Sequence, residues 1–459
     1  MEPLSIMLGV IGLLVITPLA VVGARVIWRR PAWGIVLVVA LVGLPLRTGP
    51  ETGTGVHLTP ADLGATVLVL VVALRALLVD DRRSLTRTTV LAPIAMGVAI
   101  LVAGALSTGG GAIPGMVRYL QLFCLVPLAA ALAIRDARDR TIVIGAFLAL
   151  AGLEGAFGVV QYLTHTGAGF GGQSVRAVGT FGAYDVMALS KVVAFGIVAA
   201  VAVACRGRHR RAAVVGAVLL LLPLALALSR GTWLAVAGAV AVVLLVHDAR
   251  RLIQVAAIAV VAGALVLVVS GPDSTVRRRF DSLVGTANAP DSSVRNRYEL
   301  WNAAIAMWEE HPVTGVGPKR FAELRTRYAS IALDPRSDVA DASGFRRVEL
   351  LSPHNLYLLV LSELGVLGLG AFLALLASAL GAAIGAARDR MDRSGRGEFG
   401  LFALGAVTVI AITGMSGDLG GPTTVLEAAI IGCALGCAAV PGVPRPAVAT
   451  PDEPVRVAG

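Results

Sequence analysis

Long apolar runs separated by short polar connections make up most of the chain, and one long polar interval, residues 271–353, interrupts them. Most runs extend for roughly 18–25 residues, enough for a helix to cross about 30 Å of hydrocarbon. Because backbone polar groups inside a bilayer must be satisfied within the segment, such runs predict transmembrane α-helices. The expected spans cover residues 4–24, 32–48, 60–79, 89–107, 112–134, 141–163, 180–205, 211–228, 232–247, 251–270, 355–384, 398–416 and 424–441. We therefore predict an all-α polytopic membrane protein with about 12–13 transmembrane helices.

The composition agrees with this class. Hydrophobic residues make up 56% of the chain and charged residues 15%, whereas soluble domains average about 45–50% and about 25%. Residues 1–25 have no basic leader and no clear cleavage site, so we interpret them as a retained first span. The four cysteines are expected to be small buried hydrophobes, because they lie within or at the edge of apolar runs without His or acidic partners. They are Cys124, Cys205, Cys433 and Cys437.

Arginines gather in every second connection between the expected spans. These connections hold Arg25, Arg29, Arg30, Arg82, Arg83, Arg87, Arg135, Arg138, Arg140, Arg206, Arg208, Arg210, Arg211, Arg250, Arg251, Arg388, Arg390, Arg393 and Arg396. The short connections of the other side hold only Arg47, Arg176 and Arg230. Positive charge is retained on the cytoplasmic side, so the N-terminus and residues 271–353 are expected outside and the C-terminus inside. The net charge of +10 then needs no nucleic-acid partner.

The spans divide the chain into four parts. Residues 1–270 form an N-terminal bundle of about ten spans, and residues 354–441 form the C-terminal transmembrane helices. Residues 271–353, which we call the lid, are a large external loop. The Pro-rich end, residues 442–459, is expected to be a disordered cytoplasmic tail.

Two amphipathic helices are expected in the lid. Asp291, Ser292 and Ser293 are candidate N-caps for a helix over about 294–311. An apolar stripe along it comprises Leu300, Trp301, Ala304, Ile305 and Trp308, and Arg297 lies on the same face. The turn residues Pro312, Gly315, Gly317 and Pro318 separate it from a second helix with Phe321, Leu324 and Tyr328 on one side. Such helices suggest a cap that lies on the interface or folds over the bundle.

Three external residues could carry chemistry. Arg230 directly follows the eighth span, Arg297 points with the apolar face of the lid helix, and His354 opens the eleventh span. Guanidinium groups bind phosphate oxygens bidentately and stay charged when partly desolvated. An imidazole can accept a proton from an attacking hydroxyl near neutral pH. The alternatives are a helix cap or anchor for His354, a snorkelling residue for Arg230 and an ion pair with Glu299 or Glu310 for Arg297.

Further polar residues lie inside the spans. Arg118 and Gln121 share a face near the outer end of the fifth span, where they could reach the same cavity as the three external residues. Glu363, about 13 Å deeper than His354 along its helix, is either structural support or a secondary site residue. Ionisable groups in lipid are expensive, so those at Glu154, Asp185 and Lys191 are expected to be functional or paired. Asp334, Asp338 and Asp341 are spaced too loosely for a metal site, and we expect neither metal nor cofactor.

Several motifs resemble the bacterial O-antigen ligase and O-antigen polymerase family. They are SRGTW around Arg230, R-x-x-x-W over Arg297–Trp301, HPVTGVGPKRF, and PHNLYL followed by ELG. The stretch RAVGTFGAYDVMA (Arg176–Ala188) resembles that family's RxxGTFGNPNxxA segment, but Tyr184 and Asp185 stand where the family often has Pro-Asn. The resemblance extends over roughly 150–365.

This resemblance implies a glycosyltransferase-C-like membrane fold and an inverting, metal-independent transfer. A glycan would move from an undecaprenyl (polyprenyl) diphosphate carrier to an acceptor hydroxyl outside the cytoplasmic membrane. Arg230 and Arg297 would hold the diphosphate, His354 would act as base on the acceptor, and Arg176 would contribute to substrate binding. The expected partners are the lipid-linked glycan donor, a glycan, lipid or protein acceptor, and membrane lipids.

The motifs leave the reaction class partly open. A ligase and a polysaccharide polymerase need the same handling of the donor. A transporter or flippase of a lipid-linked or anionic solute would instead use Asp185, Lys191 and Glu363 as an intramembrane relay, but the inverted repeats typical of transporters are not apparent. A non-enzymatic scaffold of the cell envelope is the remaining alternative.

Overall fold

The computed structural model describes residues 22–44, 58–79, 86–107, 112–170, 176–182, 185–258, 292–330, 336–341, 344–389, 395–417 and 419–438. Within these residues, eight helices are long and apolar enough to cross a membrane. They are α3 (Pro60–Leu78), α4 (Arg87–Leu106), the continuous segment Ile113–Ala133, α7 (Ala137–Leu163), α8 (Ala188–Arg206), α10 (Arg230–His247), α15 (Leu356–Arg388) and α16 (Arg396–Thr413). The predicted class, an all-α polytopic membrane protein, is confirmed. The glycosyltransferase-C-like topology stays a prediction.

Three further apolar helices fall on predicted spans but are shorter. They are α2 (Ala32–Val42), α9 (Arg210–Leu226) and α17 (Thr423–Gly436). The segment Ile113–Ala133 consists of α5 (Ala112–Leu120), the π-helical turn η1 (Gln121–Leu125) and α6 (Val126–Ala133). The first predicted span, most of the tenth and the tail at 442–459 lie outside the described residues.

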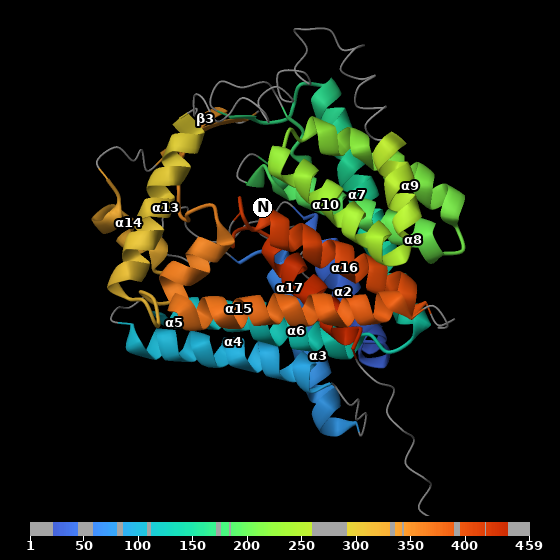
Figure 1. Ribbon diagram of the computed structural model, residues 1–459, viewed down its shortest axis with the longest axis horizontal. Helices are drawn as coiled ribbons and strands as arrows, with labels where there is room; N and C mark the ends of the chain where they lie inside the picture. Colours follow the sequence, from blue (N-terminus) through green and yellow to red (C-terminus); the bar gives the residue numbers. More distant parts are fainter. Residues whose placement is uncertain are drawn as a thin grey trace, which may run out of the picture.

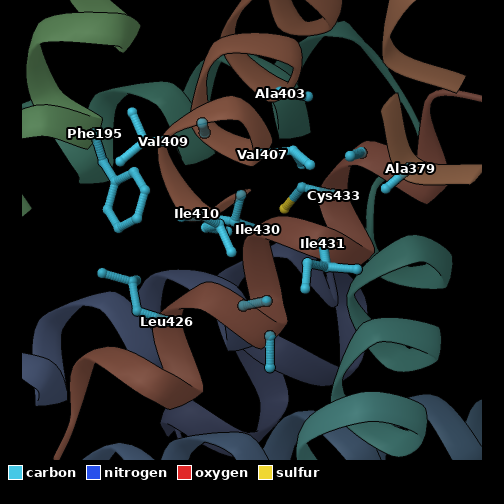
Figure 2. Packing of buried hydrophobic residues seen from close by; sticks show 14 of the residues in the cluster. Phe195, Ala379, Ala403, Val407, Val409, Ile410, Leu426, Ile430, Ile431 and Cys433 are labelled. Carbon is cyan, nitrogen blue, oxygen red and sulfur yellow. The ribbon is translucent and has the colours of Figure 1, made fainter. Parts of the chain in front are cut away.

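Two helices near the C-terminal end form the centre of the bundle. α16 packs against α8, α10 and α15, and α17 packs against α6, so both lie between the α7–α10 group and the α3–α6 group (Figure 1). Ile410 of α16, Ile430 of α17 and Phe195 of α8 belong to one buried cluster (Figure 2). At Gly432 the backbone of α17 comes so close to α6 that an added Cβ would lie 2.3 Å from the Pro127 carbonyl oxygen. Small residues allow this close helix packing, which takes the place of a hydrophobic driving force inside a membrane.

The described part of the lid contains helices and also strands. α13 (Ser292–Glu310) and α14 (Phe321–Tyr328) are the two predicted helices. β2 (Arg336–Asp341) pairs antiparallel with β3 (Gly344–Glu349) and with β1 (Gly169–Phe170), which precedes α8. The two lid helices were predicted from the sequence, and the strands were not. The sequence RSDVAD of β2 lacks the regular apolar alternation that signals a half-buried strand.

Contacts between connections test the arginine pattern. Arg30 forms ion pairs with Asp136 and Asp139 at 3.0 and 2.7 Å, which joins the connections after the first and fifth predicted spans. Arg206 donates to the Ala387 carbonyl at 2.7 Å and thereby joins those after the seventh and eleventh. All of these connections were predicted to lie on one side of the bundle, and the structure joins them there. That this side faces the cytoplasm stays a prediction.

The four cysteines are free and buried, as predicted for small hydrophobic residues. Cys124 donates its thiol to the Pro93 carbonyl at 3.1 Å inside the bundle. Within the described residues, no group of three or more His, Cys, Asp or Glu side chains is placed to hold a metal ion. Independence from metal stays a prediction.

Candidate functional site

His354 lies in a tight turn that leads into α15. Its backbone has a φ of +48°, a left-handed conformation that few non-glycine residues adopt. Its amide donates to Ser352 Oγ at 3.1 Å. The cap of α15 is Asn355, whose Oδ1 accepts from the amides of Tyr357 and Leu358 at 3.0 and 3.1 Å. Because Asn355 caps the helix, the half-buried His354 does not have that role.

The same turn is fixed to the end of α16. The Leu356 amide donates to the Gly414 carbonyl at 2.7 Å, and the Tyr357 hydroxyl donates to the Ala411 carbonyl at 2.7 Å. The PHNLYL motif thus places one residue in a strained turn, caps α15 with the next, and holds the turn against α16 with the two after that. Backbone strain of this kind persists only where the surroundings enforce it, and it is concentrated at functional sites.

Arg230, the first residue of α10, lies beside the same part of the fold. Its neighbour Gly231 packs so closely on the turn after α16 that an added Cβ would be 2.8 Å from Ser416 Oγ. Thr232 in the first turn shares hydroxyl hydrogen bonds with Ser229 and with Ser190 of α8, at 2.8 and 3.0 Å. The turn at residues 414–416 therefore contacts both the Arg230 motif and the His354 motif. The half-buried Arg230 and His354 gather around it.

The lid helix α13 adds Arg297 to this region. Trp301 Nε1 donates to the Pro353 carbonyl oxygen, directly before His354, at 2.9 Å. Arg297 is half-buried and four residues earlier, so it lies one helical turn away on the same face. The two carboxylates considered as its partners have other contacts: Glu299 accepts from Ser330, and Glu310 accepts from Tyr328 and Arg327. The elements that carry these three predicted site residues thus lie together at one end of the bundle.

The HPVTGVGPKRF motif forms the base of the lid and inserts into a break in α15. At Gly365, φ is +64°, and the helix is interrupted. Backbone groups of α15 at the break bond to the motif instead of to the helix. Val316 N donates to Ser362 O at 2.9 Å, and Val366 N donates to Pro312 O at 3.0 Å. The span at 355–384 was predicted as one continuous helix, whereas the structure interrupts that helix at Gly365. An apolar run with several glycines does not reveal which of them is non-helical.

Glu363 lies at this break, fully buried, and fastens the lid base. Its carboxylate accepts from the amides of Lys319 and Phe321 at 2.7 and 2.9 Å, at the start of α14. The hydroxyl of Tyr119 in α5 also donates to it. Of the two roles that the sequence left open, these contacts match structural support. They join the lid, α5 and α15 in one place.

Arg118 and Gln121 lie in a buried polar cluster that the sequence did not reveal in full. Arg118 forms an ion pair with Asp62 of α3 and donates to Gln121 Oε1 at 3.0 Å. Gln121 Nε2 in turn donates to Asp62 Oδ1 at 3.1 Å. Asp62 also accepts from the amide and hydroxyl of Thr59 at 2.8 and 2.9 Å, which completes a capping box. The Thr-x-x-Asp spacing was the signal that could have located Asp62.

The Arg176 segment is a loop that α7 holds. The Arg176 backbone pairs with Ala168, and Gln161 Oε1 accepts from Gly179 N at 2.8 Å. Glu154 accepts from the amide and hydroxyl of Thr180 at 2.9 and 2.7 Å. Because these bonds fix a short 3₁₀ turn, η2 (Gly179–Phe181), α8 begins only at Ala188. The predicted start of this span at residue 180 was wrong.

Two ionisable residues near the start of α8 face the connection between α16 and α17. Lys191 forms a buried ion pair with Glu427 of α17 at 2.8 Å. Asp185 packs against Gly421, where an added Cβ would lie 2.1 Å from Asp185 Oδ2. The expectation that Lys191 is functional or paired is met by pairing, and sequence reasoning missed Glu427.

One family comparison bears on these residues. Residues 215–373 match a protein family described as O-antigen ligase. The matched part includes α10, the lid and the first half of α15, and with them Arg230, Arg297 and His354. No curated protein matches the chain.

Proposed function

We propose that this chain, whose residues 215–373 match the O-antigen ligase family, transfers a glycan from an undecaprenyl diphosphate carrier to an acceptor hydroxyl at the outer face of the cytoplasmic membrane. The family implies glycan transfer of the O-antigen ligase type. The observation that carries the proposal is the gathering of Arg230, Arg297 and His354 around one end of the bundle, through the Ser416 turn and the bond between Trp301 and Pro353.

The two arginines would hold the diphosphate of the donor. Their planar guanidinium groups each offer parallel N–H donors that match two phosphate oxygens. Arg230 is also the first residue of α10, where the helix dipole adds partial positive charge. When the bond between sugar and phosphate breaks, negative charge grows on the leaving diphosphate, and fixed positive groups stabilise that charge most in the transition state.

His354 would act as the general base. A ring nitrogen accepts the proton of the acceptor hydroxyl while that oxygen forms a bond to the anomeric carbon of the donor sugar. The bond from this carbon to the diphosphate oxygen breaks, and polyprenyl diphosphate leaves with the electron pair. Attack from the face opposite the leaving group inverts the anomeric configuration. The proton then passes from the imidazolium to solvent, which restores the neutral base.

A glycan acceptor would make the enzyme a polymerase, and a lipid, protein or other envelope acceptor would make it a ligase, with the same donor site. The transporter or flippase alternative needs Lys191 and Glu363 as relay groups. Lys191 is engaged with Glu427, and Glu363 with the backbone of the lid. These contacts favour structural roles for both residues and support the transferase.

Donor binding is tested with the arginines. Arg230→Lys and Arg297→Lys each keep the charge but lose a bidentate contact, which is worth about 1.5–3 kcal/mol for a hydrogen bond to a charged group. We expect kcat/KM for release of polyprenyl diphosphate by the purified protein to fall about ten- to hundredfold. Arg327→Lys is the matched control, because the Arg327 side chain is 69% exposed on the lid.

The same assay tests the need for metal, since turnover should survive EDTA. Wild-type turnover in both the Arg230→Lys and Arg297→Lys variants would contradict the diphosphate site. Loss of turnover in EDTA that Mg²⁺ restores would contradict the metal-independent chemistry.

A further inference from the structure

We propose that Trp301 is a positioning residue, which holds the His354 turn in its active conformation through the hydrogen bond from its indole N–H to the Pro353 carbonyl. This inference rests on the proposed function, because it gives His354 the role of base. Trp301 comes from a lid helix 52 residues earlier in the chain than its acceptor. The bond therefore links the lid helix α13 directly to the residue that precedes His354.

The His354 turn needs an external restraint. A non-glycine residue with positive φ lies in an unfavourable region of backbone space, and the turn relaxes unless its neighbours fix it. After His354, the chain is fixed by the Asn355 cap and by the Leu356 amide on α16. Before His354, the Pro353 carbonyl accepts from the lid, through Trp301 Nε1 at 2.9 Å. The turn is thus held from both sides, and one side is the lid.

Other contacts of α13 hold Trp301 in place. Its ring makes an edge-to-face contact with Tyr298, with centroids 5.4 Å apart and planes at 84°. Leu300, Ala304 and Met307 of the same helix are buried in the core. α13 in turn packs on α14, whose start is bonded to Glu363. The packing of α13 and α14 on α15 therefore sets the position of the indole N–H.

A second tryptophan on the same helix separates the hydrogen bond from simple ring packing. Trp308 lies seven residues later in α13, and its Nε1 is buried with no hydrogen-bond partner among the described residues. The lid helix therefore tolerates a buried indole whose N–H is unpaired. If Trp301 only filled space, replacing its ring by phenyl should have the same effect as that replacement at Trp308.

The experiment compares Trp301→Phe with Trp308→Phe in the purified protein, both as single variants and combined with His354→Gln. We expect Trp301→Phe to lower kcat about three- to tenfold, as for loss of one hydrogen bond. The KM for the lipid diphosphate donor and the melting temperature should match those of Trp308→Phe. In the His354→Gln background, Trp301→Phe should not lower the residual kcat further, because Trp301 acts through His354.

The outcomes separate this inference from the proposed function. Equal kcat in Trp301→Phe and Trp308→Phe, with His354→Gln inactive, would overturn the role of Trp301 and leave the base assignment intact. An additive loss in the double variant would show that Trp301 acts independently of His354, and would also overturn it. Near-normal turnover of His354→Gln alone would instead overturn the base assignment, and the inference with it.

Discussion

Lys191 and Glu427 place two opposite charges inside the bundle, with their side chains 9% and 8% exposed. Removing charges from water is costly, and their mutual attraction offsets this only when both are present. Loss of one partner leaves an uncompensated buried charge, whereas loss of both leaves an apolar contact. This asymmetry makes the pair testable as a structural element.

Lys191→Met and Glu427→Leu should therefore each destabilise the protein by about 3–5 kcal/mol, and the double variant should recover most of that loss. Thermal unfolding in detergent measures both effects. We expect the double variant to retain glycan transfer, because neither side chain has a role in the proposed chemistry. A double variant that is folded and stable but has lost glycan transfer would contradict this structural role.

At the level of single residues, the sequence indicated candidate side chains but not the partners of buried charges. His354, Arg230 and Arg297 became candidates because their surroundings in the sequence are unusual, and their roles stay a prediction. Asp62 and Glu427 were missed because their partners Arg118 and Lys191 are 56 and 236 residues away. Only the fold brings such pairs together. Because ionisable residues inside a span are costly, the sequence indicated that these residues need partners. It did not indicate which residues the partners are.

Among the elements, α15 joins the lid to the bundle, because its break at Gly365 receives the base of the lid. A Cβ at Gly365 would lie 2.2 Å from the Val313 carbonyl oxygen, and φ there is +64°. This oxygen belongs to the backbone of the docked turn, so it cannot rotate away as a flexible side chain could. Glycine is therefore required at this position for both its φ and the close approach of the lid.

Gly365→Ala should displace the turn at residues 312–318 and destabilise the protein by at least about 1–3 kcal/mol. Gly370→Ala in the same helix is the matched control, because an added Cβ there meets nothing within 4 Å and alanine favours helix. Melting temperature and protease cleavage within the lid are the measurements. Equal melting temperatures and cleavage rates in the two variants would contradict the docking of the lid at Gly365.

Element by element, the apolar runs predicted the helices well and their interruptions poorly. The lid helices and the turn between them follow from capping residues and an apolar stripe, which are local signals. The α15 break, the late start of α8 and the β2–β3 hairpin depend on tertiary hydrogen bonds. Backbone groups around Gly365 bond to the lid, the Gln161 side chain accepts from the Gly179 amide, and β1 pairs with β2. No local pattern encodes those partners.

For the whole molecule, the alternation of arginines predicted which connections share a side. The bonds of Arg30 with Asp136 and of Arg206 with Ala387 join connections as that pattern requires. The proposed catalytic groups then lie at the opposite end, where α10 and α15 begin and where the lid is seated. We therefore propose one polar site, built from the bundle and the lid, in which His354 acts as the base.

The most direct test of this account is glycan transfer by the purified protein in lipid nanodiscs, with a polyprenyl-diphosphate-linked glycan as donor. His354→Gln keeps a hydrogen-bonding side chain but cannot take up the acceptor's proton. We predict that transfer falls about 10²–10⁴-fold while donor binding stays unchanged. Near-normal transfer by His354→Gln would contradict the account.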